Sequence, residues 1–449
     1  MAKPKIGEEI ELQIDSPAFG GYGIARHEGI VVFVRYAYPG ERVIARITKR
    51  KRTTIFAEQV AVLEASPARR KPPCPAFGKC GGCAMQDIEY EEQFKIKIDI
   101  VKDCLEYIGK LHDLPDFELI PADREFRYRN KMELSFGMGE TGMFLGLHVR
   151  GRFDRLVPAR DCLIMPDYAL QIVSVVEEAV NSMGLDIYNQ YSDDGLLRHL
   201  SMRFSETEGK CLLGLTMRFD EPAIAIDVFQ YVAERCDRVA GVAMVINSTT
   251  GDTAQGKKVH LFGSDFIGEE MLGLHFRISL ESFFQTNTRM ARLFYSKIAD
   301  FAGDGALAFD LFSGTGTISQ ILSPNFTNIV AIESVERAVK DARISAERNG
   351  ISNTEFIHGK VENELSEALS SASPDVVVFD PPRNGVPKRS LEAIIATGPK
   401  RIVYASCNPS TLARDLNLLD ALYSIDRIAI VDMFPQTHHI ETIVRLSLR

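Results

Sequence analysis

The sequence predicts an α/β protein whose C-terminal domain has a doubly wound parallel sheet, preceded by a small β-barrel and a mixed α+β region. From about residue 300, apolar strand segments alternate with helical segments, which is typical of a parallel sheet. Residues 5–64 instead hold short β-rich runs separated by turns, which favours a barrel. We expect three domains, at residues 1–66, 67–290 and 291–449.

Composition indicates a soluble globular protein. Of the 449 residues, 45% are hydrophobic and 25% are charged, and no run of 18 apolar residues is present to span a membrane. The start of the chain, MAKPKIGEEIELQID, lacks the apolar core of a signal peptide. We therefore expect a cytoplasmic protein without membrane contact, acting as a monomer. In that compartment, eight cysteines do not form a disulfide framework.

The charge distribution bears on the partner. The net charge of −9 by itself argues against nucleic acid. Residues 1–71, however, hold 13 Lys and Arg against 8 Asp and Glu, a balance of +5 that leaves −14 for the rest. A basic N-terminal segment on an otherwise acidic protein favours nucleic-acid binding by that segment. The alternative interpretation is a solvated surface without a partner.

The first two thirds of the chain divide at a linker. Four runs are strand candidates for the barrel: residues 10–15, 29–37, 41–47 and 54–64. The Pro- and Arg-rich residues 65–73 form the linker, and a helical stretch follows at about 85–111. Beyond it the pattern is mixed, with β-like segments at 131–137 and 211–219.

The last third shows strict β/α alternation. The apolar strand candidates are residues 306–312, 328–333, 354–359, 375–380, 401–406 and 428–434. The closing segment, 440–448, is expected to add an edge strand.

Three successive strand ends carry residues suited to a nucleoside ligand. The first runs into the small residues SGTGT at 313–317, which let the backbone approach a ligand, although the motif is not G-x-G-x-x-G. The second ends in Glu333, placed to accept hydrogen bonds from ribose hydroxyls, and the fourth in Asp380-Pro381-Pro382. This combination is similar to the Rossmann-like methyltransferase class, and a generic α/β domain is the alternative.

A cysteine follows the fifth of these strands, in Ser406-Cys407-Asn408-Pro409-Ser410. Most single cysteines are small buried hydrophobic residues. Cys407, however, lies at a strand-to-turn junction beside the expected methyl-donor site, which favours a nucleophile. Glu441, near the end of the chain beside two histidines, is the candidate base, and a solvated surface residue is the alternative.

Nearly the whole chain resembles the RNA uracil-C5 methyltransferases. The resemblance rests on SCNPSTLARD, HHIETIVRL, DPPRNG and SFFQTN. It implies transfer of a methyl group from S-adenosyl-L-methionine to carbon 5 of uracil, with Cys407 as covalent nucleophile and Glu441 as base. It also implies that the cofactor pocket is lined by Gln285, Phe312, Glu333 and Asp380. Many relatives have Asn where this chain has Thr317, which leaves that contact open.

Four cysteines form a candidate metal site. Cys74, Cys80 and Cys83 lie within ten residues and Cys162 far downstream, and four thiolates suit either zinc or an iron–sulfur cluster. The spacing resembles the [4Fe–4S] site of the 23S ribosomal RNA branch of the family, which implies a cluster with a structural role.

The resemblance extends to a TRAM domain, a small OB-like RNA-binding barrel, over the first 60 residues. FGGYG-x-A-R and YPGE carry it, and the basic residues 49–52 with Phe19 and Tyr22 are candidates for RNA contact. Further candidates, each of which also fits a salt bridge inside the central region, are Arg127, Arg129, Asn130, Lys131 and Arg198.

Three other functions are alternatives. An RNA cytosine-C5 methyltransferase carries a Pro-Cys motif where this chain has Asp380-Pro381-Pro382, and amino-methylating enzymes favour an aromatic residue where Arg383 stands. A non-enzymatic iron–sulfur RNA-binding protein does not explain the cofactor pocket. For the RNA partner, 23S ribosomal RNA is the first expectation and the T-loop uridine of transfer RNA the alternative.

Overall fold

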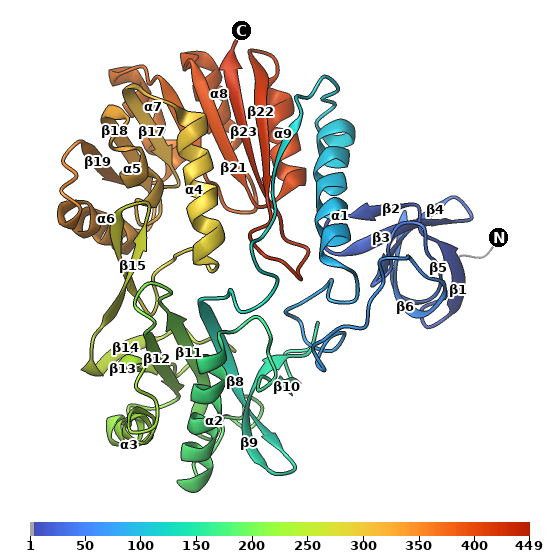
Figure 1. Cartoon of the computed structure of the whole chain (residues 1–449), viewed down its shortest axis with the longest axis vertical. Coiled ribbons are helices and arrows are strands. Elements are labelled where there is room, and N and C mark those ends of the chain that lie inside the picture. The colour runs from blue at the N-terminus through green and yellow to red at the C-terminus, as the bar shows by residue number, and fades with distance from the viewer. Residues whose placement is uncertain (1–3) are drawn as a thin grey trace.

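A curved six-stranded sheet forms the N-terminal unit of the computed structural model, which describes residues 4–449 (Figure 1). The order in the sheet is β1-β5-β6-β4-β3-β2. Its strands are β1 (Glu9–Gln13), β2 (Ser16–Ala18), β3 (Tyr22–His27), β4 (Ile30–Arg35), β5 (Arg42–Arg50) and β6 (Thr54–Glu64). Alternate residues such as Val32 and Val34 fill its core, so Phe33 between them points outward. The predicted barrel-like unit is confirmed.

The linker leads through the cysteine-rich loop into helix α1 (Tyr90–Asp103), which continues as one π-helical turn, η1 (Cys104–Ile108). The helical stretch is shorter than the 85–111 expected, because the amides of Met85 and Glu89 donate instead to the distant carbonyls of Gln436 and Ala68. Strand β7 (Phe117–Ile120) then joins the outer edge of the C-terminal sheet by pairing with β22 (Tyr423–Val431).

A seven-stranded sheet forms the central unit, in the order β10-β9-β8-β11-β12-β13-β14. Its strands are β8 (Lys131–Gly139), β9 (Gly142–His148), β10 (Leu156–Pro158), β11 (Leu197–Phe204), β12 (Cys211–Met217), β13 (Val239–Ile246) and β14 (Lys257–Gly263). Helices α2 (Asp167–Ser182) and α3 (Pro222–Ala233) pack their apolar side chains on one face. The β-like segments predicted at 131–137 and 211–219 are confirmed.

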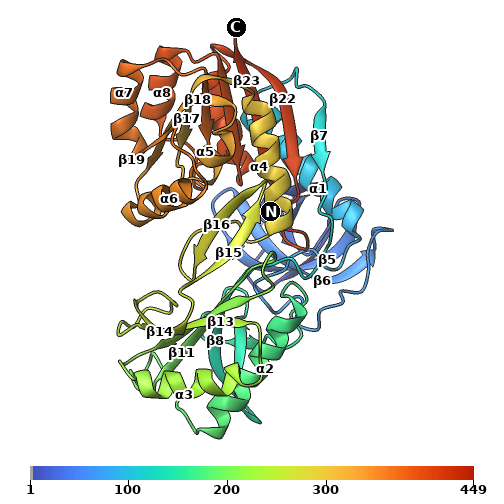
Figure 2. The same cartoon turned by 60° about the vertical axis from the view of Figure 1, so that its left-hand side comes forward.

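A two-stranded hairpin, β15 (Phe266–Met271) and β16 (Leu274–Ser279), lies between the central and C-terminal units (Figure 2). It leads to α4 (Thr288–Ala302), whose N-terminus is capped by the Asn287 side chain. The hairpin, α4 and the C-terminal sheet share one hydrophobic core, so the C-terminal unit is joined to its neighbour by packing.

The C-terminal unit is an eight-stranded sheet in the order β19-β18-β17-β20-β21-β23-β22-β7. Its remaining strands are β17 (Gly305–Leu311), β18 (Phe326–Glu333), β19 (Thr354–His358), β20 (Val376–Phe379), β21 (Arg401–Ser406) and β23 (Glu441–Leu448). Its helices are α5 (Thr317–Leu322), α6 (Glu336–Arg348), α7 (Val361–Ser371), α8 (Lys388–Thr397) and α9 (Pro409–Leu419). Helices α1, α7, α8 and α9 pack in one core and α4 and α5 in another. This doubly wound arrangement confirms the predicted α/β fold.

One strand differs from the expectation. The closing segment was expected at the edge, but β23 inserts between β21 and β22 and runs antiparallel to both. Its residues 441–444 are buried, and an apolar strand of this kind gains more by burial on both faces than at an edge. Within residues 4–449, no helix is both long and apolar enough to cross a membrane.

Candidate active site

A cavity of about 750 Å³ lies at the carboxyl edge of the C-terminal sheet. All six residues predicted for catalysis and cofactor binding line it: Gln285, Phe312, Glu333, Asp380, Cys407 and Glu441. They come from the carboxyl ends of β17, β18, β20 and β21, from the start of β23 and from the segment before α4. The topology explains the convergence, because the carboxyl ends of the parallel strands meet at one edge and the antiparallel β23 begins at that same edge.

The loop after β17 is shaped for close approach of a ligand. Phe312, Gly314 and Gly316 all have positive φ angles, of 66°, 55° and 73°, so the backbone doubles back before α5. The amide of Gly314 donates to Glu333 Oε2 (3.0 Å) and that of Val335 to Glu333 Oε1 (2.8 Å). The Glu333 carboxylate is thereby fixed at the cavity wall with lone pairs left for a ligand.

Two carboxyl groups near this loop, the buried Asp310 and the cavity-lining Asp380, have raised pKa values. Asp310 accepts from the Ser319 amide (2.9 Å), and burial raises its pKa to about 6. Burial raises the pKa of Asp380 to about 7, and the nearby Asp310 charge adds to the rise. Perturbed carboxyl groups of this kind gather at functional sites.

Gln285 is positioned from the central unit. The Asn130 side chain, which is buried, donates to the Gln285 carbonyl (2.9 Å) and to Thr288 Oγ1 (2.9 Å). Arg203 of β11 donates to the carbonyl of Ser282 in the same segment. Asn130, predicted as a candidate RNA contact, is therefore used to hold the cavity wall.

Cys407 and Glu441 face each other across the pairing of β21 with β23. Ser406 is paired with Thr442 in the antiparallel register, so the next step places Cys407 beside Glu441. Burial raises the pKa of the Cys407 thiol to about 11; Glu441 and then Asp380 add to the rise, and nearby Arg383 opposes it. Burial and the Asp380 charge raise the pKa of Glu441 well above its usual range.

The local sequence explains how the cysteine is presented. Asn408 is the N-cap of α9: its side-chain oxygen accepts from the Ser410 amide (3.1 Å), and Pro409 occupies the first helical turn. The side-chain nitrogen of Asn408 also donates to the carbonyl of Arg383 (2.9 Å). Cys407 thus lies directly before a helix N-terminus, and the loop after Asp380 is fastened to it.

The strand β23 is reached through a tightly held loop. Gln436 is fully buried with a positive φ of 67°, and its carbonyl accepts from the amides of Ala84 (2.9 Å) and Met85 (3.1 Å). Lys97 Nζ is bonded to Asp432 Oδ1 (2.7 Å), with both side chains fully buried. Ala84, Met85 and Lys97, which follow the loop of Cys74, Cys80 and Cys83, therefore fix the segment that leads to Glu441.

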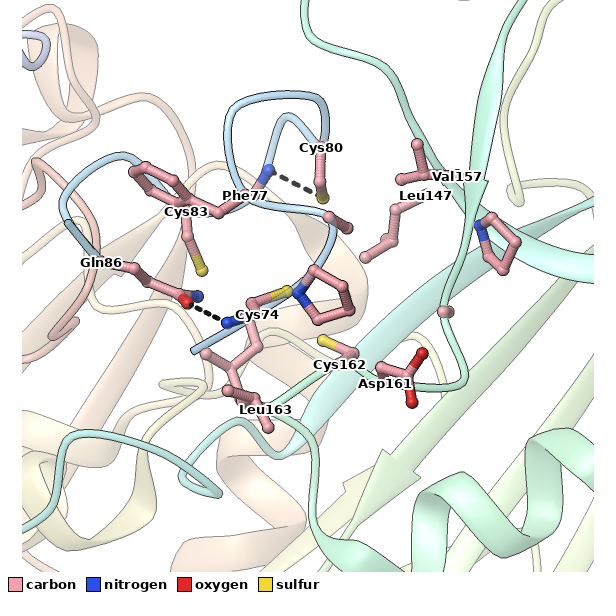
Figure 3. A pocket seen from close by; sticks show the side chains of 16 residues that line it. Cys74, Phe77, Cys80, Cys83, Gln86, Leu147, Val157, Asp161, Cys162 and Leu163 are labelled. Atoms are coloured by element: carbon pink, nitrogen blue, oxygen red, sulfur yellow. Dashed lines mark hydrogen bonds between the residues drawn. The ribbon is translucent and has the colours of Figure 1, made fainter. Parts of the chain in front are cut away.

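The four predicted cysteines line a separate cavity. Figure 3 shows the sulfurs of Cys74, Cys80, Cys83 and Cys162 facing a common space. The Gly82 amide donates to Cys80 Sγ (3.3 Å), and burial raises the pKa of the free Cys83 thiol to about 12. No three His, Cys, Asp or Glu side chains of the described residues converge closely enough to hold one metal ion. The cysteines instead surround free space of about 50 Å³.

The other candidates for RNA contact in the central region have internal partners, and Arg129 donates to the carbonyl of Lys131 (3.0 Å). Arg127 is ion-paired with Asp167 (2.8 Å) and Lys131 with Glu133 (3.0 Å). Arg198 donates to backbone carbonyls.

The sequence did not predict Tyr295 and Phe434, which also line the catalytic cavity. Neither residue belongs to a motif, so no sequence signal was available for them.

The comparisons with known proteins agree with this geometry. A family profile described as tRNA (Uracil-5-)-methyltransferase matches residues 246–449, and a TRAM domain profile matches residues 3–60. An uncharacterized RNA methyltransferase of Clostridium tetani is 38% identical over 98% of both chains. Another, from Caldanaerobacter subterraneus, is 37% identical over 97% of this chain and 98% of its own.

Among solved structures, the chain resembles the Pyrococcus abyssi tRNA (uracil-54, C5)-methyltransferase in complex with S-adenosyl-L-homocysteine. The TM-score is 0.76 and the identity 24%, covering 97% of this chain and 100% of the other, which shows a shared fold. The family match excludes the non-enzymatic alternative. The chain belongs to the RNA uracil-5 methyltransferase family with a TRAM domain, whose members transfer a methyl group from S-adenosyl-L-methionine to carbon 5 of uracil.

Proposed function

We propose that Cys407 is the covalent nucleophile of this enzyme and Glu441 its base. Carbon 5 of uracil is a weak nucleophile. Addition of the Cys407 thiolate to carbon 6 moves electron density to carbon 5, which then takes the methyl group from the sulfonium. Glu441 removes the proton from carbon 5, and the electrons of that bond expel the thiolate and restore the ring. The observation that supports both roles is their adjacency across β21 and β23.

The surroundings of Cys407 supply what a thiolate needs. Arg383 lowers the pKa of the thiol, against the rise caused by burial. The N-terminus of α9, directly after Cys407, adds a partial positive charge. Arg383 and the helix N-terminus both stabilise the thiolate once the bound uracil ring has displaced water from the cavity.

Glu441 has the environment of a strong base. Burial and Asp380 raise its pKa, so the carboxylate accepts a proton readily, and nearby Arg383 opposes part of that rise. The same cation therefore serves the nucleophile and the base.

We infer that four cavity residues hold S-adenosyl-L-methionine, which supplies an electrophilic methyl group on a sulfonium. Glu333, fixed by two backbone amides, is placed to accept from the ribose hydroxyls. Phe312 presents an apolar ring beside the glycine turn, and Gln285 and Asp380 line the cavity toward Cys407.

We further propose that Cys74, Cys80, Cys83 and Cys162 hold a [4Fe–4S] cluster. The free volume of about 50 Å³ exceeds the roughly 10–15 Å³ needed for one water-sized sphere, so the space suits a group larger than a single ion. Most of the surrounding side chains are apolar, with Gln86 and Asp161 as the polar exceptions, and backbone amides point at the sulfurs of Cys80 and Cys162. Such amide–sulfur bonds are one way proteins tune iron–sulfur clusters.

The RNA partner is proposed to be 23S ribosomal RNA, bound by a cytoplasmic monomer. The cysteine set and the TRAM barrel support this choice, whereas the archaeal structural relative acts on a transfer RNA, which keeps that substrate as the second candidate. Mass mapping of 5-methyluridine in both RNAs, with and without this gene, tests the assignment. Loss of a 23S site is the expected result, and loss of only the T-loop site would favour transfer RNA.

A further inference from the structure

A second large cavity lies on the central sheet, away from the catalytic cavity. Its volume is about 740 Å³, similar to that of the catalytic cavity. Leu134 and Phe136 of β8 pack into the core beneath α2 and α3, so Ser135 between them points to the opposite face of the sheet. His148 of β9 and His199 of β11 lie on that same face, and we call this space the central pocket.

The floor of the central pocket is polar. Ser135 Oγ lies 3.1 Å from His148 Nε2 and 3.1 Å from His199 Nδ1. The Asp252 carboxylate lies 3.2 Å from His148 Nε2 and 3.3 Å from His199 Nε2. His199 is only 6% exposed, yet its Nε2 has no partner in hydrogen-bond geometry. A buried polar group without a well-aligned partner carries a cost that a polar ligand can offset.

Asp252 is held in place rather than free to swing. The Arg198 guanidinium donates to the carbonyls of Asn247 (2.6 Å) and Thr249 (2.5 Å), which fixes the loop that presents Asp252. Arg198 is itself packed 4.3 Å from the ring centre of Tyr188. An oriented carboxylate in a cavity is prepared to accept hydrogen bonds from a ligand.

The rim of the central pocket is aromatic. Phe153 is 62% exposed and Tyr191 is 76% exposed, and both line the cavity. Large exposed rings beside a polar floor are the combination that binds an unpaired base, by stacking on its face and hydrogen bonding to its edge.

The pocket is connected to the active site by one strand. From His199, β11 continues on the same face to Arg203, whose guanidinium donates to the carbonyl of Ser282 in the catalytic cavity wall. The four residues of strand from His199 to Arg203 span roughly 13 Å. The central pocket and the wall of the catalytic cavity therefore lie along one strand, so an RNA strand that follows β11 contacts both.

We propose that the central pocket binds an unpaired guanine of the substrate RNA, a few nucleotides from the methylated uracil. The base stacks on Phe153 and Tyr191, and its N1–H and N2–H groups donate to the Asp252 carboxylate. Guanine is favoured because it presents two adjacent donors to a pair of acceptor oxygens, whereas uracil and adenine present an acceptor beside a single donor. This inference depends on the chain's being an RNA methyltransferase and not on the roles of Cys407 and Glu441.

The test measures binding of fluorescein-labelled dodecauridine that carries one central guanosine, inosine, adenosine or cytidine. Wild-type protein should bind the guanosine oligomer about tenfold more tightly than the inosine one, which lacks the N2 amino group. Asp252→Asn should remove that preference. Phe153→Ala and Tyr191→Ala should each weaken binding of the guanosine oligomer roughly tenfold, the size of one base–aromatic stack. The control, Tyr107→Ala, removes a ring that is 72% exposed but lies outside both cavities.

Unchanged affinity in Phe153→Ala and Tyr191→Ala would refute the pocket as a base site. A guanosine preference that is absent in wild type, or that persists in Asp252→Asn, would refute the recognition of guanine. Binding of S-adenosyl-L-methionine by calorimetry confirms that each variant is folded. Adduct formation with RNA containing 5-fluorouracil reports the Cys407 chemistry separately, so failure of one proposal is distinguished from failure of the other.

Discussion

Cys407 lies opposite Glu441, one step beyond the Ser406–Thr442 pair that joins β21 to β23. The relationship follows from the insertion of an antiparallel strand into a parallel sheet. In a parallel pair, the strand ends that lie side by side would both be carboxyl ends, whereas here the start of β23 meets the end of β21. The proposed nucleophile and the proposed base are therefore positioned by one antiparallel ladder, at whose end both residues lie.

The first prediction concerns Arg383. Because its charge lowers the pKa values of Cys407 and Glu441, Arg383→Gln should raise both. At pH 8 the thiolate fraction falls, and alkylation of Cys407 by iodoacetamide should be several-fold slower, with its pH profile moved to higher pH. Arg389→Gln, on the exposed side of α8, is the matched control. Superimposable profiles for wild type and Arg383→Gln would show that Arg383 does not activate the thiol.

The cysteine cavity gives the second prediction. Protein purified without oxygen should be brown, with about four irons per chain if the four thiolates hold a [4Fe–4S] cluster. Replacing any one of Cys74, Cys80, Cys83 or Cys162 by Ala should lower iron content and soluble yield. Cys236→Ala, at a buried cysteine outside that cavity, should keep the iron. A colourless protein with one zinc per chain would contradict the assignment.

The third prediction concerns the barrel. Lys49, Arg50 and Lys51 are exposed at the β5–β6 turn, beside an outward face where Phe33 and Phe56 stack at 5.3 Å. Changing the three cations to Gln should weaken RNA binding and reduce its salt slope by up to about 0.7 for each phosphate that is no longer neutralised. An unchanged salt dependence of RNA binding, measured by fluorescence anisotropy, would show that this turn does not contact the RNA phosphates.

Deletion of the whole barrel is a less clean experiment. Phe19 packs edge-on against His438 with ring centres 5.9 Å apart, within three residues of Glu441. The charge variants leave this packing intact, so methyl transfer at saturating RNA should persist in them. The sequence suggests that Phe19 stacks on an RNA base, whereas in the structure its ring joins the barrel to the segment that precedes β23.

The fourth prediction concerns stability. The Lys97–Asp432 pair is fully buried, and Lys97→Met leaves the Asp432 charge without its partner. The free energy of unfolding should fall by about 3–5 kcal/mol, measured by urea denaturation. The double variant Lys97→Met/Asp432→Leu should recover most of this stability, because no uncompensated charge remains. The exposed Lys95→Met serves as control, and an equal effect of Lys95→Met and Lys97→Met would contradict a stabilising role for the buried pair.

Much of this arrangement was predictable because it is local. The succession of strand segments along the chain, the glycine turn before α5 and the acid at the end of β18 are each recognisable from neighbouring residues, and parallel topology then brings them together. The position of β23 was not predictable from an apolar pattern, since the pairing partner of a strand is a long-range choice. The same holds for β7, which joins β22 across some 300 residues of chain.

The contacts that hold the site residues in position could not be predicted from the sequence either. Asn130 and Gln285 are 155 residues apart, and a single buried Asn has no signal that distinguishes it from a surface residue. Gln436 has a positive φ angle that only its tertiary hydrogen bonds stabilise. Sequence motifs identify groups that react, whereas groups that position them are recognised by geometry.

The central claim is that Cys407 bonds to the base, and denaturing gels with labelled RNA containing 5-fluorouracil test it directly. Fluorine cannot leave carbon 5 as a cation, so wild-type enzyme with S-adenosyl-L-methionine should give a shifted covalent band. Glu441→Gln should give such a band even with normal uracil, because its C5 proton cannot leave easily. Cys407→Ala should give none while still binding S-adenosyl-L-methionine. A covalent band or near-normal turnover with Cys407→Ala would contradict this mechanism.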